Sequence, residues 1–385
     1  MKDYPKVRLN TSAPSHPWIY WNATDKLALP PGTVVDVYDK DDHWIGRGFY
    51  NAHARIRVRL LTTDQRESID PSFFDGRIAE AVAFRKEILQ LEQTTNAFRL
   101  VHSDGDQLGG VVIDRFAHLL VLQFYSAGMY RFRDAIQQSL QKHFPGASFY
   151  SFAEEHVQKQ ESFDLREMAH PEPVEIFEGK LRLQVWVGTK HKTGFFLDQR
   201  ENRLRFAELC QGKNVLDLCS HTGAFALHAC AKNAKQVTAV ELDEEAVQLA
   251  EQNAGLNGLS VKFLVADVLE WLHSQRTSSQ YDRIVLDPPK QTRSEENVRQ
   301  ALNRYFEMNR LAIKTVTEGG ILLTCSCSGL IKEDTFIETL HRAAQTSGKT
   351  LQIFRISGAA PDHPFLIENP EGRYLKAIWA RVFKR

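Results

Sequence analysis

A thiol and a carboxylate close two apolar runs in the second half of the chain. Asp287 follows Y-D-R-I-V-L and opens D-P-P-K, and Cys325 and Cys327 close the run G-G-I-L-L-T-C-S-C-S. In an open α/β sheet, ligands bind beyond the carboxyl ends of the strands. A thiol at such an edge can act as a nucleophile. Two prolines behind Asp287 stiffen its loop and favour a positioned carboxylate.

A cysteine and an acid of this kind suit methylation of a pyrimidine at carbon 5. Cytosine C5 is a poor nucleophile, but a thiolate that adds to C6 converts C5 into an enamine carbon. That carbon can attack a sulfonium methyl group. A carboxylate near N3 stabilises the protonated adduct, and loss of the C5 proton then expels the thiol. The chemistry requires one cysteine, one acid and a methyl donor.

The stretch Lys213–Asp243 predicts a site for the donor. It contains an apolar run at Val215–Leu218, an Ala-rich segment with helical periodicity at Thr222–Ala231, and a second apolar run at Val237–Val240 closed by Glu241. This order is typical of a βαβ unit. A carboxylate at the tip of its second strand can accept both hydroxyl groups of a ribose.

The loop inside this unit indicates which nucleoside ligand binds. A dinucleotide site requires G-x-G-x-x-G, so that bare backbone can approach a pyrophosphate. Here C-S-H-T-G-A holds only Gly223, among the hydroxyl residues Ser220 and Thr222. That pattern favours a ligand with ribose and adenine but no phosphate, and S-adenosylmethionine fits. Asp267, expected to end the next strand, could hold the adenine amino group while Glu241 holds the ribose.

Composition limits the partners and the compartment. The 385 residues carry 48 basic and 48 acidic side chains, so contacts with nucleic acid must come from local patches. The N-terminus has no apolar signal core, and no run is long enough to span a membrane. Five cysteines without C-x-x-C spacing indicate a reduced, cytoplasmic, metal-free protein. A homodimer stays open.

The periodicity predicts three domains. Residues 1–69 alternate short strand-like runs with turns, which favours a small β-barrel. Residues 70–187 mix strands and helices, beginning with Asp70-Pro71 as a helix cap, and form an α+β middle domain. Residues 188–385 alternate strands with helices, which predicts an α/β fold with a doubly wound, mostly parallel sheet.

Three arginines in the first domain could contact phosphates. Arg55, Arg57 and Arg59 alternate with aliphatic residues, and a period of two would place all three on one face of a strand. The stretch from Arg47 to Arg66 holds five arginines and one acid, Asp64. Arginine without interleaved acids favours a phosphate-binding surface over an ordinary solvated strand face.

The chain resembles the bacterial large-subunit (23S) ribosomal RNA cytosine-5 methyltransferases that carry an N-terminal PUA domain. The likeness covers essentially the whole length. It rests on H-K-T-G-F-F-L-D-Q-R-E-N-R (191–203), the S-x-T-G-x-F loop (220–225), D-P-P-K (287–290), S-C-S-G-L (326–330), and D-H-P (362–364) with P-E-G-x-Y-L-K (370–376). Together these motifs are highly specific, whereas D-P-P alone is not.

The resemblance implies a PUA barrel, a strand-strand-helix-strand-strand middle domain and a Rossmann-like domain that binds S-adenosylmethionine. It assigns Cys327 as the nucleophile and Asp287 as the acid that holds the base. Gln199 and Arg200 would help to close the donor pocket. The methionine end of the donor would be surrounded by Asp217, Ser220, Thr222 and Gly223.

The chain departs from the family pattern at several positions. Cys219 and His221 stand where aromatics are usual, Ala224 replaces a glycine, and Cys325 adds a second thiol. The fourth-strand acid, Asp287, lacks the adjacent cysteine of the two-cysteine RNA cytosine methyltransferases. These differences concern the pocket and product release rather than the reaction.

Three other functions stay open at this stage. Ribosomal guanine methyltransferases share the S-x-T-G-x-F and D-P-P motifs but need no cysteine nucleophile. Methylation of uracil at carbon 5 is chemically close. A non-catalytic RNA-binding module would keep the barrel and lose the donor site, and the presence of Gln199, Glu241 and Asp267 argues against it.

Overall fold

The structure, a computed structural model, describes residues 3–166, 168–188, 194–275 and 280–385. The first three residues of the motif at 191–203 lie outside the described residues. The chain forms two compact units. Unit 1 comprises Met1–Ile176, Val185–Leu197 and Pro361–Gly372, and unit 2 comprises Phe177–Gln184, Asp198–Ala360 and Arg373–Arg385. This division is coarser than the three-domain prediction, whose boundaries stay a prediction.

The N-terminal part of unit 1 is a five-stranded sheet in the order β1-β3-β4-β5-β2. Every second residue of β3 points inward, so Val35 and Val37 are fully buried. A small core with Val7, Ile19 and Val58 results. The strands are β1 (Lys6–Arg8), β2 (Trp18–Tyr20), β3 (Thr33–Tyr38), β4 (Trp44–Tyr50) and β5 (Ile56–Thr62).

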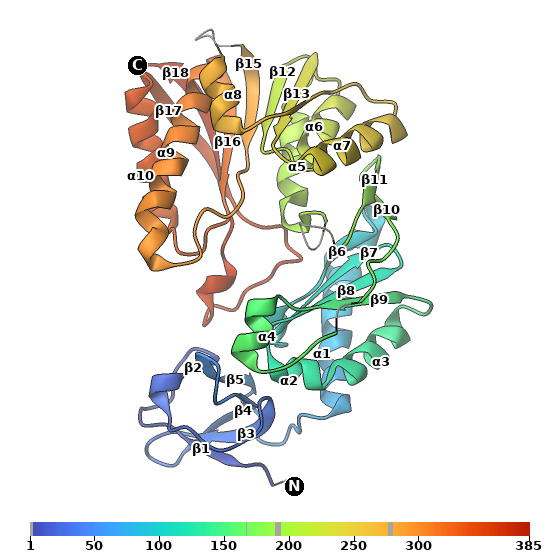
Figure 1. The fold of residues 1–385 in the computed structure, drawn as a ribbon, viewed down its shortest axis with the longest axis vertical. Coiled ribbons are helices and arrows are strands. Elements are labelled where there is room, and N and C mark those ends of the chain that lie inside the picture. Colours follow the sequence, from blue (N-terminus) through green and yellow to red (C-terminus); the bar gives the residue numbers. More distant parts are fainter. Residues whose placement is uncertain (1–2, 167, 189–193, 276–279) are drawn as a thin grey trace. The chain divides into compact units, whose positions relative to one another are not determined.

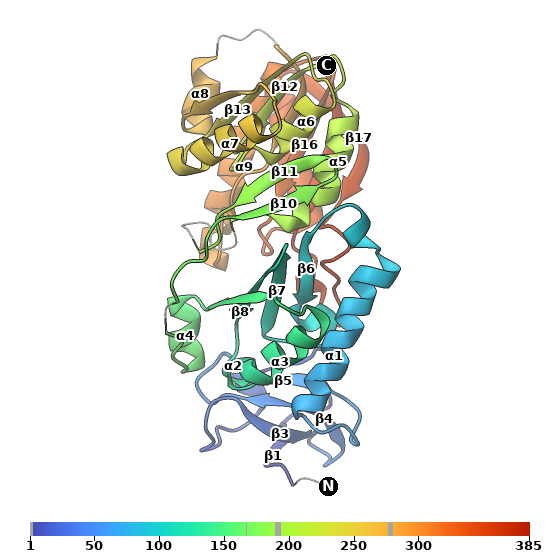
Figure 2. The same ribbon diagram turned by 90° about the vertical axis from the view of Figure 1, so that its right-hand side faces the viewer.

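The rest of unit 1 is a four-stranded sheet in the order β6-β7-β8-β9, against which α1 and α3 pack (Figure 2). The predicted cap of α1 is confirmed, since the Asp70 carboxylate accepts the backbone N–H groups of Ser72 and Phe73. The elements are α1 (Pro71–Ala83), β6 (Ala97–His102), β7 (Val111–Phe116), β8 (Leu119–Phe124), α2 (Ala127–Arg131), α3 (Arg133–His143), β9 (Ser148–Phe152) and α4 (Glu155–Glu161).

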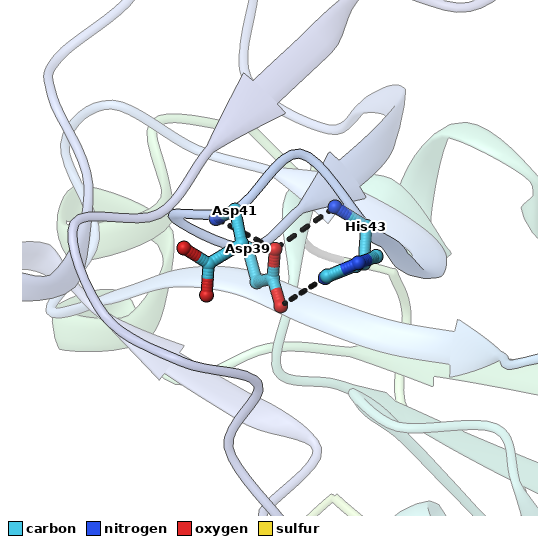
Figure 3. A group of neighbouring side chains, drawn as sticks. All are labelled: Asp39, Asp41 and His43. Atoms are coloured by element: carbon cyan, nitrogen blue, oxygen red, sulfur yellow. Dashed lines mark hydrogen bonds and ion pairs between the residues drawn. The ribbon is translucent and has the colours of Figure 1, made fainter.

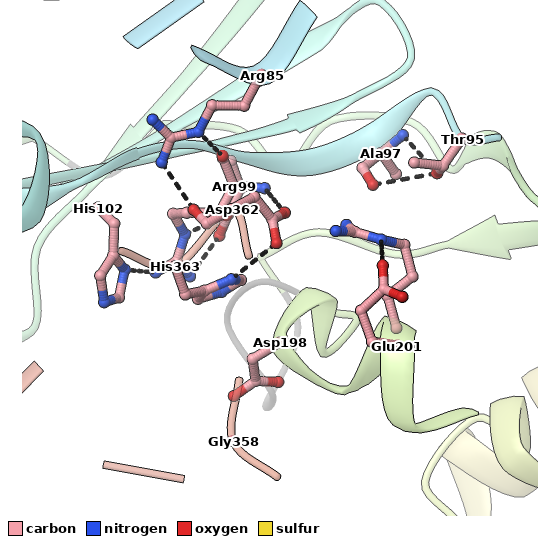
Figure 4. Close-up of polar contacts among 12 residues, drawn as sticks. Arg85, Thr95, Ala97, Arg99, His102, Asp198, Glu201, Gly358, Asp362 and His363 are labelled. Atoms are coloured by element: carbon pink, nitrogen blue, oxygen red, sulfur yellow. Dashed lines mark hydrogen bonds and ion pairs between the residues drawn. The ribbon is translucent and has the colours of Figure 1, made fainter. Parts of the chain in front are cut away.

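A late segment of the chain, Pro361–Gly372, belongs to unit 1 and is held there by buried charged groups (Figure 4). The fully buried Arg85 guanidinium forms a two-pronged ion pair with Asp106 and donates to the backbone oxygen of Asp362 at 2.7 Å. The Asp362 carboxylate accepts the backbone N–H of Arg99 at 2.9 Å. The D-H-P motif therefore anchors this segment inside unit 1.

Unit 2 is built on a seven-stranded sheet in the order β14-β13-β12-β15-β16-β18-β17 (Figure 1). The first five strands run parallel, and β18 runs antiparallel to both of its neighbours. This confirms the predicted fold class. The strands are β12 (Asn214–Leu218), β13 (Gln236–Glu241), β14 (Lys262–Val265), β15 (Tyr281–Leu286), β16 (Val316–Ser326), β17 (Lys349–Ser357) and β18 (Lys376–Lys384).

Helices cover both faces of this sheet. Along β12, Val215 packs with the helices of one face, whereas Leu216 packs with those of the other. The first face carries α5 (Arg200–Glu208) and α6 (Ala224–Ala231), and α7 (Glu244–Leu256) lies beside α6 (Figure 1). The second face carries α8 (Val268–Ser274), α9 (Val298–Thr315) and α10 (Glu333–Thr346).

A buried ion pair fastens the β10–β11 hairpin (Val174–Glu178 and Leu181–Val185) to the helices of unit 2. Glu178 accepts two hydrogen bonds from the Arg203 guanidinium, at 2.7 and 2.6 Å, and lies 2.9 Å from His228 Nε2. The pairing with Arg203 and His228 outweighs burial and holds the pKa of Glu178 below its ordinary value.

We expect Glu178→Gln to lower the free energy of unfolding by about 3–5 kcal/mol, because the buried Arg203 guanidinium loses the charged carboxylate that it pairs with. The depressed pKa makes this stabilisation fully present above about pH 4.5, and it is lost as the pH falls through the folded-state pKa. Denaturant unfolding between pH 3 and pH 7 measures both effects. Glu175→Gln, on the exposed side of β10, should change stability little. Equal stability of the two variants would contradict the assignment.

Candidate active site

The loop between β12 and α6 has an unusual backbone. Cys219, His221 and Gly223 have φ angles of 59°, 49° and 75°, so three residues out of five are left-handed. Such backbone strain in non-glycine residues is most common at functional sites. At Gly223 a Cβ atom would also lie 2.9 Å from the Phe263 ring. Glycine is therefore required here by packing as well as by backbone conformation.

Glu241, at the carboxyl end of β13, supports this loop. One carboxylate oxygen accepts the His221 backbone N–H at 2.8 Å, and the other accepts the N–H groups of Leu242 and Asp243 at 2.7 and 3.1 Å. An ionised carboxylate has about four acceptor positions, so capacity for a ribose hydroxyl remains. The structure places Glu241 at the predicted strand tip, and ribose binding stays a prediction.

Two buried polar atoms beside the loop have no hydrogen-bond partner in the described part of the chain. They are Asp217 Oδ1 and Ser220 Oγ, whereas Asp217 Oδ2 accepts the Ala226 backbone N–H at 3.0 Å. Burial raises the pKa of Asp217 to about 8. Buried polar groups are normally satisfied, so these atoms indicate a polar ligand. Together with Thr222, which is also buried, they suit the amino-acid end of S-adenosylmethionine.

Asp267 lies two residues beyond the strand that it was expected to end. Strand β14 stops at Val265, and Asp267 is the N-cap of α8, with Oδ1 accepting the Glu270 backbone N–H at 3.0 Å. The expectation of a strand-terminal acid is therefore wrong in detail, because the turn from strand to helix intervenes. A role in binding adenine stays a prediction.

Asp287 is oriented by a chain of side-chain hydrogen bonds. Gln199 Nε2 donates to Asp287 Oδ2 at 2.9 Å, and Asn202 Nδ2 donates to Gln199 Oε1 at 2.7 Å. Ser357 Oγ donates to Asn202 Oδ1 at 2.8 Å and accepts from Trp379 Nε1 at 2.8 Å. Gln199 was predicted to close the donor pocket, and its amide nitrogen is observed to donate to Asp287, the residue that follows β15.

Arg200 follows Gln199 into α5 and is almost completely buried. Its Nε donates to the Glu201 carboxylate at 3.4 Å. Its predicted contribution to the donor pocket stays a prediction.

The two thiols of the C-S-C-S run have different surroundings. Cys325 lies within β16, is fully buried, and packs in the core with Val285 and Trp379. Cys327 follows the last residue of β16 and is half-buried, with Sγ 4.0 Å from the backbone oxygen of Pro288. Only Cys327 of the two is open to a ligand at the strand ends.

Burial and nearby carboxylates raise the pKa values of both Asp287 and Cys327. Burial raises the pKa of Asp287 to about 7, and the nearby charge of Asp198 adds to the shift. Burial and the charge of Asp287 raise the pKa of the Cys327 thiol to about 12. At neutral pH the free site therefore holds a protonated thiol beside a carboxyl group that can take up or release a proton.

The three arginines of the N-terminal sheet do not share one exposed face. Arg55 precedes β5 and is exposed, Arg57 is buried, and the Arg59 guanidinium lies 3.6 Å from the buried Glu161 carboxylate. The pairing of β5 with β2 skips Arg57, which forms a bulge and interrupts the alternation. The expectation of a shared exposed face is thus wrong for two of the three side chains.

Two residues that sequence reasoning missed also belong to this region. Asn202 lies within the motif at 191–203, and Lys376 ends the motif at 370–376, yet neither was assigned a role. Lys376 Nζ donates to the backbone oxygens of Ser328 and Tyr374, both at 2.8 Å. For Lys376, the sequence signal that could have indicated a role was a lysine at the start of a mostly apolar predicted strand.

One group of potential metal ligands occurs in the described residues, at the turn between β3 and β4 (Figure 3). The Asp39 carboxylate accepts the backbone N–H groups of Asp41 and His43, both at 2.9 Å, and lies 3.3 Å from His43 Nδ1. These bonds, above all the one from the His43 backbone, lower the pKa of Asp39. The group is explained by the turn, and the predicted absence of metal stays a prediction.

Within the described residues, no helix is both long and apolar enough to cross a membrane.

Comparison with known proteins defines the class. Residues 154–364 match the family described as S-adenosylmethionine-dependent methyltransferase, and residues 14–63 match the PUA-like domain. S-adenosylmethionine is therefore the cofactor, and the predicted PUA-like and methyltransferase architecture is confirmed.

Full-length relatives narrow the class to one family. Ribosomal RNA large subunit methyltransferase I of Pseudoalteromonas atlantica is 37% identical over 379 residues, covering 95% of both chains. The protein of that name from Escherichia coli is 36% identical over 378 residues, again covering 95% of both chains. The chain belongs to the ribosomal RNA large subunit methyltransferase I family.

A solved structure supports the fold over nearly the whole chain. A candidate S-adenosylmethionine-dependent methyltransferase from Streptococcus mutans has a TM-score of 0.82 at 21% identity, covering 98% of this chain and all of the other.

We expect Glu241→Gln to weaken S-adenosylmethionine binding about tenfold, which corresponds to about 1.4 kcal/mol. The substitution removes the charge that strengthens a hydrogen bond to a ribose hydroxyl, while one side-chain oxygen can still support the His221 backbone. Titration calorimetry measures the change. Asp243→Asn, at the cap of α7, is the control, because Asp243 binds the backbone of that helix. Unchanged affinity in Glu241→Gln would refute the ribose assignment.

Proposed function

We propose that this protein forms 5-methylcytosine in large-subunit ribosomal RNA through a covalent adduct between Cys327 and cytosine C6. The observation that carries the proposal is the pair at the strand ends, a half-buried thiol at Cys327 beside the oriented carboxyl group of Asp287. Family membership supports ribosomal RNA as the substrate, because the relatives are named as large-subunit ribosomal RNA methyltransferases.

The first step transfers one proton and forms one bond. The Cys327 thiol gives its proton to the Asp287 carboxylate, and the thiolate adds to C6 of the cytosine. As the S–C6 bond forms, the electrons of the C5–C6 double bond move through the ring, and N3 takes the proton from Asp287. A carboxyl group with a pKa of about 7 suits both halves of this exchange.

The second step completes the substitution. The bound donor supplies a sulfonium methyl group, which the enamine carbon C5 attacks. Loss of the C5 proton to a base then restores the C5–C6 double bond and expels the Cys327 thiolate. The proton on N3 returns through Asp287 to this thiolate, which restores the starting thiol and carboxylate. Because Cys325 is fully buried in the core, we assign release to Cys327 and a base rather than to a second thiol.

The donor would lie along the loop from Asp217 to Gly223. The unpaired atoms of Asp217 and Ser220 would bind its amino-acid end, and Glu241 its ribose. Asp267 at the start of α8 would reach the adenine. Gln199 and Arg200 would bound the pocket, with Gln199 also holding Asp287 in place.

The N-terminal sheet would bind RNA, with Arg55 as the exposed one of the three arginines. Arg57 adds a buried guanidinium whose Nε and Nη1 lack acceptors among the described residues, and a phosphate would satisfy them. Arg59 is partly neutralised by Glu161 and would contribute less. Domains at 1–69, 70–187 and 188–385, a cytoplasmic location and a homodimer stay predictions.

We expect Arg55→Ala to weaken RNA binding and to reduce the salt slope of log K by about 0.7–0.9, the value for one lost phosphate contact. Donor binding should not change, because the donor residues belong to unit 2. Arg66→Ala is the matched control, since the exposed Arg66 already pairs with Asp64 at 2.6 Å. Titrations at several salt concentrations measure the slope. An equal slope in the wild type and Arg55→Ala would contradict the RNA assignment.

Mapping of methylated bases tests the proposed function. Large-subunit RNA from cells that lack the protein should regain 5-methylcytosine at one position after incubation with the protein and S-adenosylmethionine. Transfer to guanine would support the cysteine-independent guanine methyltransferases, and transfer to uracil would revise the base specificity. The absence of transfer to any ribosomal RNA would overturn the proposal in favour of an RNA-binding module.

A further inference from the structure

Lys376 is a buried lysine at the start of β18. Its side chain donates to two backbone oxygens, of Ser328 and Tyr374, and the residue is only 5% exposed. Among the residues that the structure describes, no carboxylate lies within ion-pair distance of Nζ. Carbonyl oxygens accept from an ammonium group but do not neutralise it. This charge therefore has no counter-ion among the residues that the structure describes.

The strand pairing brings Lys376 against the segment that carries Cys327. In the antiparallel register, Lys376 lies opposite Ser326, the residue before Cys327. Its ammonium group bonds to the backbone of Ser328, the residue after Cys327. Lys376 therefore contacts the backbone on both sides of Cys327.

A thiolate at Cys327 would provide the missing negative charge. An uncompensated buried charge is costly, and an opposite charge nearby removes part of that cost. The attraction exists only when the sulfur is ionised, so it favours the thiolate over the thiol. Burial lowers the pKa of Lys376 to about 8, and the charge of Cys327 acts in the opposite direction.

We propose that Lys376 is a positioning residue whose ammonium group stabilises the Cys327 thiolate. The proposal rests on the proposed function in one respect, that Cys327 is the attacking group. Since Lys376 is almost completely buried, it acts through the thiol and not on the RNA. It would also hold the backbone on the carboxyl side of Cys327 in place while the adduct forms and breaks.

Other charged groups surround Lys376 and set the pH range of the effect. Glu333 at the start of α10 favours its charged form, whereas Lys290 after β15 and Arg373 before β18 oppose it. From α9, Tyr305 is hydrogen-bonded to the Ser328 hydroxyl. With a pKa lowered to about 8, Lys376 is charged below that pH and loses its charge above it. Its support for the thiolate should therefore be present at pH 7 and fade above about pH 9.

The test measures the reactivity of Cys327 in the full-length protein without RNA or donor. Iodoacetamide labelling, read by peptide mass spectrometry, gives the alkylation rate of each cysteine. At pH 7 the Cys327 rate in Lys376→Met should be about tenfold lower than in the wild type, as for a rise of about one pKa unit in the thiol. The ratio should approach one above about pH 9, a change that a purely structural role would not produce.

Three controls make the result specific. Cys230 in the same sample is the internal reference, and its rate should not change. Lys384→Met removes an exposed lysine from the far end of β18 and should leave the Cys327 rate unchanged. Lys376→Arg restores a charge that does not titrate, so its Cys327 rate should exceed that of Lys376→Met even at pH 9.

The outcomes separate this proposal from the proposed function. An equal Cys327 rate in the wild type and Lys376→Met at pH 7, with donor binding retained, would overturn the role of Lys376 even if cytosine methylation is demonstrated. If RNA assays fail to show cytosine methylation, a tenfold fall would still establish the coupling of the lysine to the thiol. A ratio that stays constant from pH 7 to pH 10 would also overturn the proposal, because it would indicate altered access.

Discussion

Cys327→Ala should reduce methyl transfer at least about 10³-fold while S-adenosylmethionine binding stays within twofold of the wild type. The substitution removes the only sulfur of the C-S-C-S run that is open to a ligand, and in the proposed mechanism enamine formation at C5 depends on that sulfur. Single-turnover transfer of a labelled methyl group to RNA measures the rate, and calorimetry measures donor affinity.

Cys325→Ala is the matched control for this prediction. Its thiol lies two residues earlier, in the core beside Trp379, and burial raises its pKa well above the ordinary value. We expect substantial activity to remain, with some loss of stability from the small cavity. Full activity in Cys327→Ala, or loss of activity only in Cys325→Ala, would contradict the assignment of the nucleophile.

Asp287→Asn should lower kcat/KM by about 10²–10⁴-fold, the usual contribution of a positioned acid–base group. The amide can neither take the thiol proton nor give one to N3. The activity of the wild type should also increase as the pH rises through about 7. The active form of the Cys327–Asp287 pair holds one proton, on the thiol, so that Asp287 can accept it. Below the Asp287 pKa a second proton occupies the carboxylate and blocks this transfer.

The pH profile distinguishes this role from a structural one. In Asp287→Asn the rise near pH 7 should disappear, whereas Asp282→Asn, at the opposite end of β15, should keep it. Asn202→Ala should retain part of the activity and shift the rise, because Gln199 would lose the partner that orients its amide. An unchanged rise near pH 7 in Asp287→Asn would exclude Asp287 as the titrating group.

Local sequence patterns were sufficient to predict the sheet of unit 2 and the edge where its ligands would bind. Apolar runs closed by Glu241, Asp287 and Cys327 predicted parallel strands, and parallel strands bring their carboxyl ends to one edge. The Asp70-Pro71 cap was equally local, because a cap depends on residues within one helical turn.

The features that were missed depend on contacts between distant segments. Lys376 reaches the backbone next to Cys327 through an antiparallel pairing of β16 with β18, which no short-range pattern encodes. The bond from Gln199 to Asp287 likewise joins residues 88 positions apart. Arg57 was misplaced because a bulge is set by the register with β2, while alternation alone predicts an unbroken strand.

Trapping of the covalent intermediate tests the central claim most directly. RNA that carries 5-fluorocytosine at the target position should form a stable adduct with the protein and S-adenosylmethionine, because fluorine cannot leave C5 as a proton does. Peptide mapping should locate the RNA on Cys327, and the adduct should be absent in Cys327→Ala. An adduct on Cys325 would reverse the assignment of the nucleophile. Methyl transfer that persists in the double Cys325→Ala, Cys327→Ala variant would contradict covalent catalysis and indicate a guanine-type methyltransferase.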